Sequence, residues 1–306
     1  MRAVSVLLVL SFVPACGQDP ATKPPAAPSG VPVRAANPAA VAGYDLSKPR
    51  RVFALPDELR EVSGIVAVDE RTIACVQDEK GSIYWFDLEQ GKVVRSAKFG
   101  PKGDYEGLAR RGDAFFVLRS DGVLLQLAAK DDRFEIAKEI ALPFGPREYE
   151  GLAMDRGKPQ LLIAPKSVAK DDKDSRVLYA FDLERGEAVA EPVLTFALAD
   201  VLTAAQRLKV EVPVKLTDKG KEKLQLRMHL SEVAVHPTTG DRWLLAGADR
   251  VILVVDGVGA VLGLHTFPVD QLPQPEGATF LPSGDLVIAS EGAGGAAVLH
   301  IYAKAR

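Results

Sequence analysis

The pentapeptide Tyr-Glu-Gly-Leu-Ala occurs twice in the chain, once from Tyr105 and once from Tyr149, and each copy opens a longer repeated unit. The unit consists of a short aliphatic run, a polar turn, a strongly apolar run, a second turn and a third apolar run. Five such units begin near Val62, Tyr105, Tyr149, Leu230 and Pro275. Because a unit of this size cannot bury its apolar face alone, the repetition predicts that neighbouring copies pack against one another.

Short apolar runs separated by Gly and Asp turns are typical of strands, and a fourth run follows each of the first four units. Units of four antiparallel strands at a spacing of about 43 residues predict a β-propeller, because closing the ring removes long exposed sheet edges. The last unit lacks a fourth run, and residues 49–56, PRRVFALP, resemble the fourth run at residues 139–144. We therefore expect residues 49–56 to form the outer strand of the last blade and to close the ring.

The number of blades depends on the interval between the third and fourth units, which is nearly two spacings long. A sixth, degenerate blade is the alternative count. Residues 197–229 contain a helix-like stretch near residues 198–209 and a lysine-rich segment, without the strand–turn–strand order of the other units. We therefore predict an all-β propeller of five four-stranded blades over residues 44–306, with an insertion at about residues 197–229.

The N-terminal residues indicate export. Residues 1–16, MRAVSVLLVLSFVPAC, place Arg2 before an apolar run that is too short to span a bilayer, which is the layout of a signal peptide. The end of this segment is similar to a bacterial lipoprotein box, although Pro14 stands where a small or aliphatic residue is usual. Cleavage before Cys16 would leave a lipidated N-terminal cysteine, whereas a plain secretory signal would be cut elsewhere.

Residues 17–43 are rich in Pro and Ala and hold almost no large apolar side chains, so we expect them to form an extended tether. The sequence thus predicts a protein of the bacterial cell envelope, periplasmic or at the cell surface, with the lipid as its only contact with the membrane. A formal net charge of −3 excludes the basic field that nucleic-acid binding needs. We expect a monomer, and Cys75 as the one other cysteine leaves no intramolecular disulfide after processing.

The repeated glutamate carries the strongest functional signal. The first strand of a propeller blade lies beside the central channel, and aligning the strands gives one equivalent position at the channel mouth. That position holds Glu106, Glu150, Glu232 and Glu276, with Ser63 in the first blade. If neighbouring carboxylates lie about 8 Å apart, each pair repels by roughly 2 kcal/mol at an effective dielectric constant of about 20. Such a ring requires a compensating positive charge.

Candidates for this charge lie at the ends of the second strands, where Arg119, Lys166 and Arg147 are found together with further acids. The further acids are Asp78, Asp121, Asp249 and Glu291. Calcium suits an all-oxygen cluster, which makes the four glutamates candidate metal ligands. An internal Arg/Lys network and a cationic ligand are alternatives, and so is a purely structural role in which each glutamate binds backbone amides of the next blade. His229 either reaches the mouth as a base or ligand or is a surface histidine.

Several segments of the chain are similar to one family of bacterial proteins. These segments are EVSGIVAV, DYEGLA, EYEGLAMD, LSEVAVHP and QPEGATFLPSGDLVIASE. Over roughly residues 50–303 they resemble the SdiA-regulated (YjiK-like) family of bacterial envelope β-propellers. The resemblance implies a propeller fold and a location in the envelope, and it implies no particular activity.

Two classes of function remain. The favoured one is a binding or interaction module whose acidic channel mouth recognises a small ligand, an envelope polymer or an envelope protein. The alternative is a calcium-dependent hydrolase, phytase-like on phosphoesters or lactonase-like, with a carboxylate or His229 as the base. The sequence contains no HExxH, GxSxG or CxxC motif and no phosphate-binding glycine loop, which removes support from zinc-protease, α/β-hydrolase and nucleotide-enzyme functions.

Overall fold

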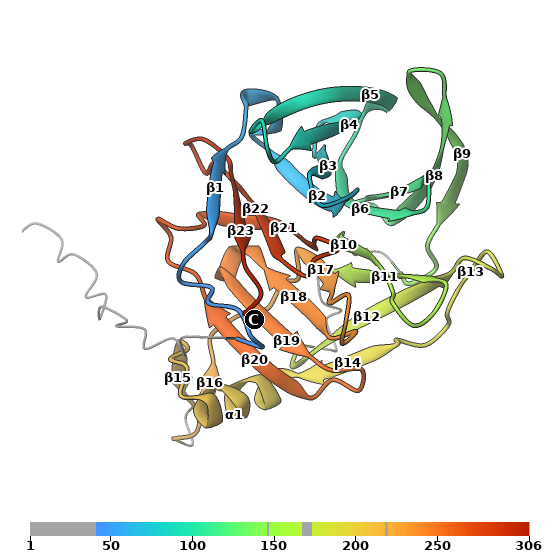
Figure 1. Ribbon diagram of the computed structural model, residues 1–306. Helices are drawn as coiled ribbons and strands as arrows, with labels where there is room; N and C mark the ends of the chain where they lie inside the picture. Colours follow the sequence, from blue (N-terminus) through green and yellow to red (C-terminus); the bar gives the residue numbers. More distant parts are fainter. Residues whose placement is uncertain (1–40, 146, 167–172, 218–219, 306) are drawn as a thin grey trace, which may run out of the picture. The chain divides into compact units, whose positions relative to one another are not determined.

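The computed structural model describes residues 41–305, except residue 146 and residues 167–172 and 218–219 (Figure 1). Contacts divide the chain into Met1–Arg34 and Ala35–Arg306, and all described residues belong to the second unit. The predicted signal peptide, Cys16 and most of the predicted tether lie outside the described residues. Within the described part, no helix has the length and apolar character needed to cross a membrane.

The described residues form five antiparallel blades, each written here from the inner to the outer strand. Blade 1 contains β2 (Val62–Ala67), β3 (Thr72–Gln77), β4 (Lys80–Asp87) and β5 (Lys92–Lys102). Blade 2 contains β6 (Tyr105–Arg111), β7 (Ala114–Arg119), β8 (Val123–Lys130) and β9 (Arg133–Ala141). Blade 3 contains β10 (Tyr149–Met154), β11 (Gln160–Pro165), β12 (Ser175–Asp182) and an outer strand split into β13 (Glu187–Ala188) and β14 (Leu194–Ala197). Blade 4 contains β17 (Glu232–Val235), β18 (Arg242–Ala246), β19 (Val251–Val255) and β20 (Val261–Thr266).

Blade 5 closes the ring with residues from both ends of the propeller. It contains β21 (Gln274–Phe280), β22 (Leu286–Glu291), β23 (Val298–Tyr302) and, as its outer strand, β1 (Arg51–Ala54). Strand β1 pairs antiparallel with β23, and the amide of Leu55 extends the ladder by donating to the Ala297 carbonyl at 2.8 Å. The prediction of five blades closed by an N-terminal strand is confirmed, and the alternative of six blades is wrong.

The five inner strands surround the axis. Strand β2 contacts β6, β6 contacts β10, β10 contacts β17, β17 contacts β21, and β21 returns to β2. Glycines permit this close approach, because a Cβ atom at Gly107 would lie 2.6 Å from the Glu150 carbonyl oxygen. A Cβ atom at Gly277 would lie 2.4 Å from the Ser63 carbonyl oxygen. The Gly of the repeated Glu-Gly pair is therefore required by the contact between blades.

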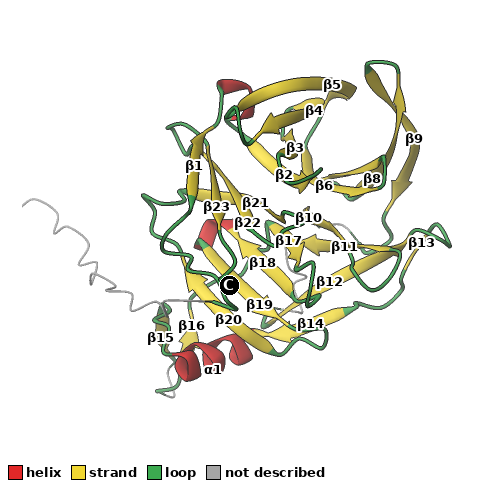
Figure 2. Cartoon of the chain, in the orientation of Figure 1, coloured by secondary structure: helices red, strands yellow, loops and turns green. Residues whose placement is uncertain are grey.

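The segment between blades 3 and 4 adds no blade. It contains helix α1 (Leu198–Leu208), drawn in red in Figure 2, and the two-stranded sheet of β15 (Val214–Leu216) and β16 (Glu222–Leu224). The helix buries Leu198, Val201, Ala204 and Ala205, which lie along one face. These side chains join a core cluster with strands of blades 3 and 4, so the segment fills the space between those blades.

Candidate functional site

β-bulges position three of the four repeated glutamates. The register of the first strand shifts between Tyr105 and Gly107, between Tyr149 and Gly151, and between Pro275 and Gly277. In each case the residue passed over is the glutamate. A bulge leaves its extra residue outside the ladder and redirects the side chain, and bulges are frequent beside functional sites. Ser63 lies within the corresponding bulge of β2, whereas Glu232 begins β17 in regular register.

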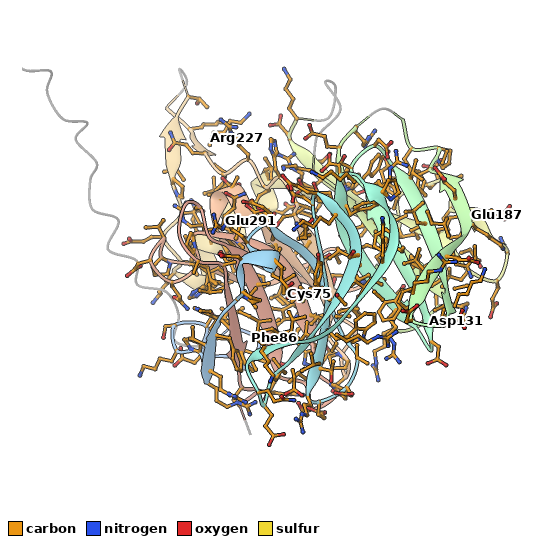
Figure 3. The ribbon with its side chains drawn as sticks, turned by 90° about the horizontal axis from the view of Figure 1, so that it is seen from above. Cys75, Phe86, Asp131, Glu187, Arg227 and Glu291 are labelled. Carbon is orange, nitrogen blue, oxygen red and sulfur yellow. The ribbon has the colours of Figure 1, made fainter. Side chains whose placement is uncertain are left out.

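The structure brings the four glutamates into one electrostatic cluster and adds Glu291 at the end of β22. Glu106 interacts with Glu150, Glu150 interacts with Glu276, and Glu276 interacts with Glu291. Figure 3 shows Glu291 toward the same side of the described propeller as Arg227, away from Phe86. We call the five glutamates, together with Lys166, the acidic site.

Burial is the largest cause of the raised pKa at every one of these carboxyl groups, and neighbouring acids add to it. The pKa of Glu106 rises to about 9, and that of Glu150 rises to about 8. The pKa values of Glu276 and Glu291 rise to about 7, and the pKa of Glu232 rises well above its ordinary value. The carboxyl groups of the acidic site consequently hold their protons to a higher pH than ordinary carboxyl groups do.

Glu232 is 1% exposed and joins two blades. Its Oε1 accepts hydrogen bonds from the backbone amides of Leu152 on blade 3 and Val233 on blade 4, both at 2.9 Å. The structural role considered from the sequence thus applies to this oxygen. The other oxygen, Oε2, is also buried and has no hydrogen-bond partner within the described residues.

Lys166 supplies positive charge to the acidic site. Its Nζ forms an ion pair with Oε1 of Glu150, while Oε2 of Glu150 is buried without a hydrogen-bond partner in the described part of the chain. Burial acts to lower the pKa of Lys166, but the pair with Glu150 and the charges of Glu276 and Glu106 outweigh it, so that the pKa is raised. Lys166 therefore remains charged and favours the ionised form of Glu150, against the effect of burial.

The structure does not bring Arg119 to the acidic site, contrary to the sequence-based expectation. Arg119 pairs with Asp121 at 2.5 Å and with Glu139 of the outer strand β9 at 3.5 Å. The reason is an offset of one residue. The amide of Ser120, like that of Lys166, donates at 3.0 Å to the residue two places before the glutamate of its own blade, so Ser120 is the counterpart of Lys166. Successive side chains of a strand point to opposite faces, which directs Arg119 away.

Of the other charged residues proposed from the sequence, some lie near the acidic site and others have partners elsewhere. Arg147 donates to the Tyr179 hydroxyl at 3.2 Å, and its guanidinium lies 5.5 Å from the centre of that ring. Asp249 accepts from the Met228 amide at 2.7 Å. Asp78, in contrast, lies near the acidic site, because it interacts with Glu291 and its own pKa is raised by burial and by neighbouring acids.

His229 follows a backbone segment that is anchored from two sides. Arg176 donates through Nε to the Met228 carbonyl at 2.9 Å and through a second nitrogen to the Arg227 carbonyl. Asp249 holds the amide of the same Met228. Burial lowers the pKa of His229, and the charges of Arg176 and Lys166 lower it further, so the imidazole is neutral at pH 7.

The acidic site does not fit calcium as it is arranged. Among the described residues, no three His, Cys, Asp or Glu side chains are grouped so that they could hold one metal ion. Glu232 commits one oxygen to two backbone amides, and Glu150 commits one oxygen to Lys166. Calcium needs six to eight oxygen ligands, and the metal-site prediction on Glu106, Glu150, Glu232 and Glu276 finds no support in this geometry.

Sequence reasoning missed the polar residues that flank the glutamates. Asp104 raises the pKa of Glu106, whereas Gln274 and Ser231 lower the pKa of Glu276. Their position one or two places before a repeated glutamate was the available signal. It also missed Arg176, whose partners Met228 and Arg227 are far away in the sequence, so no local pattern identifies it.

Comparison with known proteins identifies the fold of the chain but does not assign the chain to a family. No family model and no curated protein matches the chain. The chain is similar to the solved structure of Myxococcus xanthus glutaminyl cyclase, with 14% sequence identity, a TM-score of 0.53, and coverage of 84% of this chain and 95% of that chain. A streptogramin B lyase structure has 11% identity and a TM-score of 0.47, covering 82% of this chain and 97% of that chain. At 14% identity the similarity to the glutaminyl cyclase shows the β-propeller fold alone, and membership of the SdiA-regulated family stays a prediction.

Proposed function

We propose that this propeller is a binding module whose acidic site takes a small organic cation, such as a primary amine or a guanidinium. The observation that carries the proposal is the pair of buried oxygens without partners, Oε2 of Glu150 and Oε2 of Glu232. Leaving a buried acceptor unsatisfied costs about 1–3 kcal/mol. An ammonium group offers three donors, and a hydrogen bond from it to either oxygen would remove that cost there.

The chemistry of the acidic site favours a cation over an anion, because its carboxyl groups can release protons to match a bound positive charge. The site holds five carboxyl groups and one ammonium group, and burial raises the pKa values of the carboxyl groups by more than Lys166 lowers them. Lys166 shows how a positive charge acts here, since its contact with Glu150 lowers the pKa of that carboxyl group against the effect of burial. A bound cation would do the same at neighbouring carboxyl groups, so binding should release protons.

The experiment is a thermal-shift titration with ethanolamine, putrescine and arginine methyl ester as probes. We expect at least one probe to raise the unfolding temperature, because a ligand of the folded state adds about 2.7 kcal/mol at a hundredfold excess over Kd. The substitutions Glu150→Gln and Glu232→Gln should remove most of this shift. Glu70→Gln, on the exposed turn after β2, is the matched control and should keep it. Acetamide and acetate should give no shift, and a uniform lack of response to all three cations contradicts the proposal.

The same proposal includes a location in the cell envelope, which the sequence of residues 1–16 supports. A lipid on Cys16 would hold the propeller in the cell envelope, where an amine-bearing small molecule, envelope polymer or envelope protein could present the cation. Mass spectrometry of the mature protein should find acyl chains on Cys16, and Cys16→Ala should move the protein to the soluble fraction. A mature N-terminus at another residue contradicts the anchor.

A second candidate is acid–base catalysis without a metal. It is favoured by Glu276 and Glu291, whose pKa values rise to about 7, and by His229, whose pKa is lowered by burial and which, like them, interacts with Lys166. Groups that titrate near the working pH are suited to general acid–base chemistry. Turnover of a lactone or phosphoester that survives chelation and is lost in His229→Gln would favour this candidate over simple binding.

A further inference from the structure

We propose that the crevice between blades 2 and 3 is a second binding site, and that its ligand is an alkyl monocarboxylate of medium chain length. The crevice has a volume of about 280 Å³. It is lined by strands β6 to β9 of blade 2 and by the end of β12 with the turn that follows it. The lining includes none of the residues of the acidic site.

The crevice exists because the outer layer is incomplete at this position. Between blades 1 and 2, the long outer strands β5 and β9 contact each other. Between blades 3 and 4, helix α1 and the segment after it fill the space with apolar side chains. Blade 3 offers β9 only the two-residue strand β13 (Figure 1). The inner part of the blade 2–3 interface is consequently packed, while its outer part stays open.

The floor of the crevice is apolar. Phe116 and Phe181 are 4% and 3% exposed, and the partly buried Ile140 and Leu183 pack against the same core cluster. Phe116 pairs with Gln126, and Gln126 pairs with Lys138, so these three side chains form one row across the sheet. The row runs from the buried floor to the exposed rim, so the crevice is apolar at its floor and charged at its rim.

The rim is cationic. Arg111 and Lys138 are exposed, and neither takes part in an ion pair among the described residues. None of the nine lining residues is acidic. Two cations above an aromatic floor complement a carboxylate head group on an alkyl chain, because the head group gains charge-assisted hydrogen bonds while the chain leaves water. A cationic or neutral amphiphile would gain only the second of these.

The test is calorimetric titration with butanoate, hexanoate and octanoate. Affinity should rise roughly fourfold with each added methylene that is buried. Arg111→Gln and Lys138→Gln should each weaken octanoate binding about tenfold, and Leu183→Glu should abolish it. Lys130→Gln and Arg133→Gln, on the same β8–β9 hairpin but outside the lining, are matched controls and should bind as wild type does.

Octylamine serves as the probe of reversed charge and should bind far more weakly than octanoate. Equal binding of octylamine and octanoate, or wild-type affinity in both rim variants, would overturn the proposal. These side chains are exposed, so loss of folding does not confound the rim variants, and their unfolding temperatures check this directly. Glu150→Gln should leave octanoate binding unchanged, which keeps the outcome separate from that of the acidic site.

Discussion

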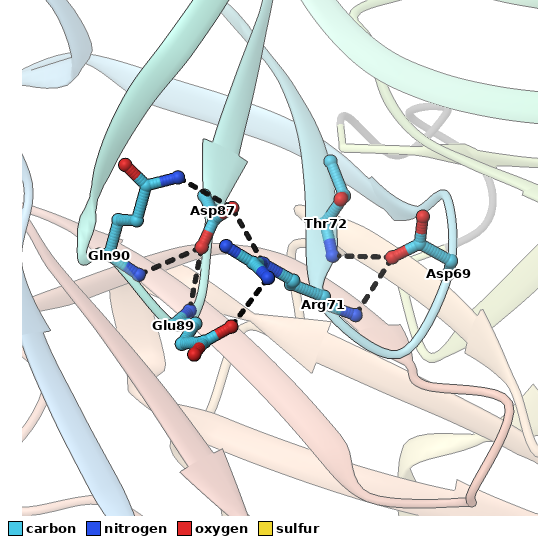
Figure 4. A network of polar contacts seen from close by, with 6 residues as sticks. All are labelled: Asp69, Arg71, Thr72, Asp87, Glu89 and Gln90. Atoms are coloured by element: carbon cyan, nitrogen blue, oxygen red, sulfur yellow. Dashed lines mark hydrogen bonds and ion pairs between the residues drawn. The ribbon is translucent and has the colours of Figure 1, made fainter.

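Two sets of repeated carboxyl groups lie at different positions of the blades and have opposite environments. One set consists of the inner-strand glutamates of the acidic site. The other consists of Asp87, Asp182 and Asp256, each at the end of the third strand of its blade or one residue beyond it. Asp87 accepts from the amides of Glu89 and Gln90, both at 2.8 Å, and pairs with Arg71 at 2.8 Å (Figure 4). Asp182 and Asp256 likewise accept two backbone amides each.

The pKa values follow this difference. Hydrogen bonds from the backbone of Gln90 and from other groups lower the pKa of Asp87 to about 2, and the pKa of Asp182 is lowered for the same kind of reason. At Glu150, burial dominates and raises the pKa to about 8. A repeated acid whose oxygens are satisfied is a turn cap, whereas a repeated acid buried with a free oxygen is a candidate for ligand binding. Recurrence in the sequence does not separate the two.

The largest effect should come from Glu232, because it combines both kinds of environment. Glu232→Ala removes the acceptor of two buried amides, at Leu152 and Val233, and should lower the free energy of unfolding by about 2–4 kcal/mol. Glu232→Gln keeps an acceptor oxygen and should change stability little. Chemical denaturation of both variants measures the difference. Equal losses in the two would mean that the side chain acts through its charge.

An effect that is smaller per pH unit should appear in the pH dependence of Glu150→Gln. The folded-state pKa of Glu150 is raised, so between pH 4.5 and 8 the folded protein binds the proton more strongly than the unfolded chain. Wild-type stability should therefore fall as the pH rises through this window, with a slope of up to about 1.4 kcal/mol per pH unit from this group. The glutamine variant lacks that contribution. Parallel stability profiles for the two proteins would show that Glu150 is already ionised.

The smallest effect should come from Asp87→Asn, and it should have the opposite dependence on pH. The folded-state pKa of Asp87 is depressed, so its contribution is present above the unfolded pKa near 3.8 and is lost as the pH falls toward 2. We expect a modest fall in unfolding temperature at pH 7 that becomes much smaller as the pH falls to 2. A difference from wild type that persists at pH 2 would indicate a loss of packing rather than of charge.

The sequence predicted the blades better than the partners within the acidic site. Five repeated units and the likeness of residues 49–56 to residues 139–144 were enough for the ring and its closure, because both rest on pairing between short, regular strands. The glutamate position was also readable from the repeat. The same alignment placed Arg119 beside Lys166 in error, since an offset of one residue sends a strand side chain to the other face.

The features that the sequence did not predict depend on contacts between residues far apart in the chain. The anchoring of residues 227–228 by Arg176 and Asp249 joins the inserted segment to blades 3 and 4, and no local pattern encodes such a contact. The split outer strand of blade 3 likewise depends on which residues after Asp182 find a partner on β12. Sequence periodicity could not show that the crevice beside blade 2 is left open there.

Proton release on cation binding tests the central claim most directly. Calorimetry at pH 7 would use the cation with the largest thermal shift, in two buffers of different ionisation enthalpy that contain no primary amine. We predict binding whose observed enthalpy differs between the buffers, because a cation displaces protons from carboxyl groups whose pKa values lie at or above 7. Glu150→Gln should reduce both the affinity and the buffer dependence. Binding with the same enthalpy in both buffers, or no binding at all, would contradict the claim that these buried glutamates form a protonated site for a cation.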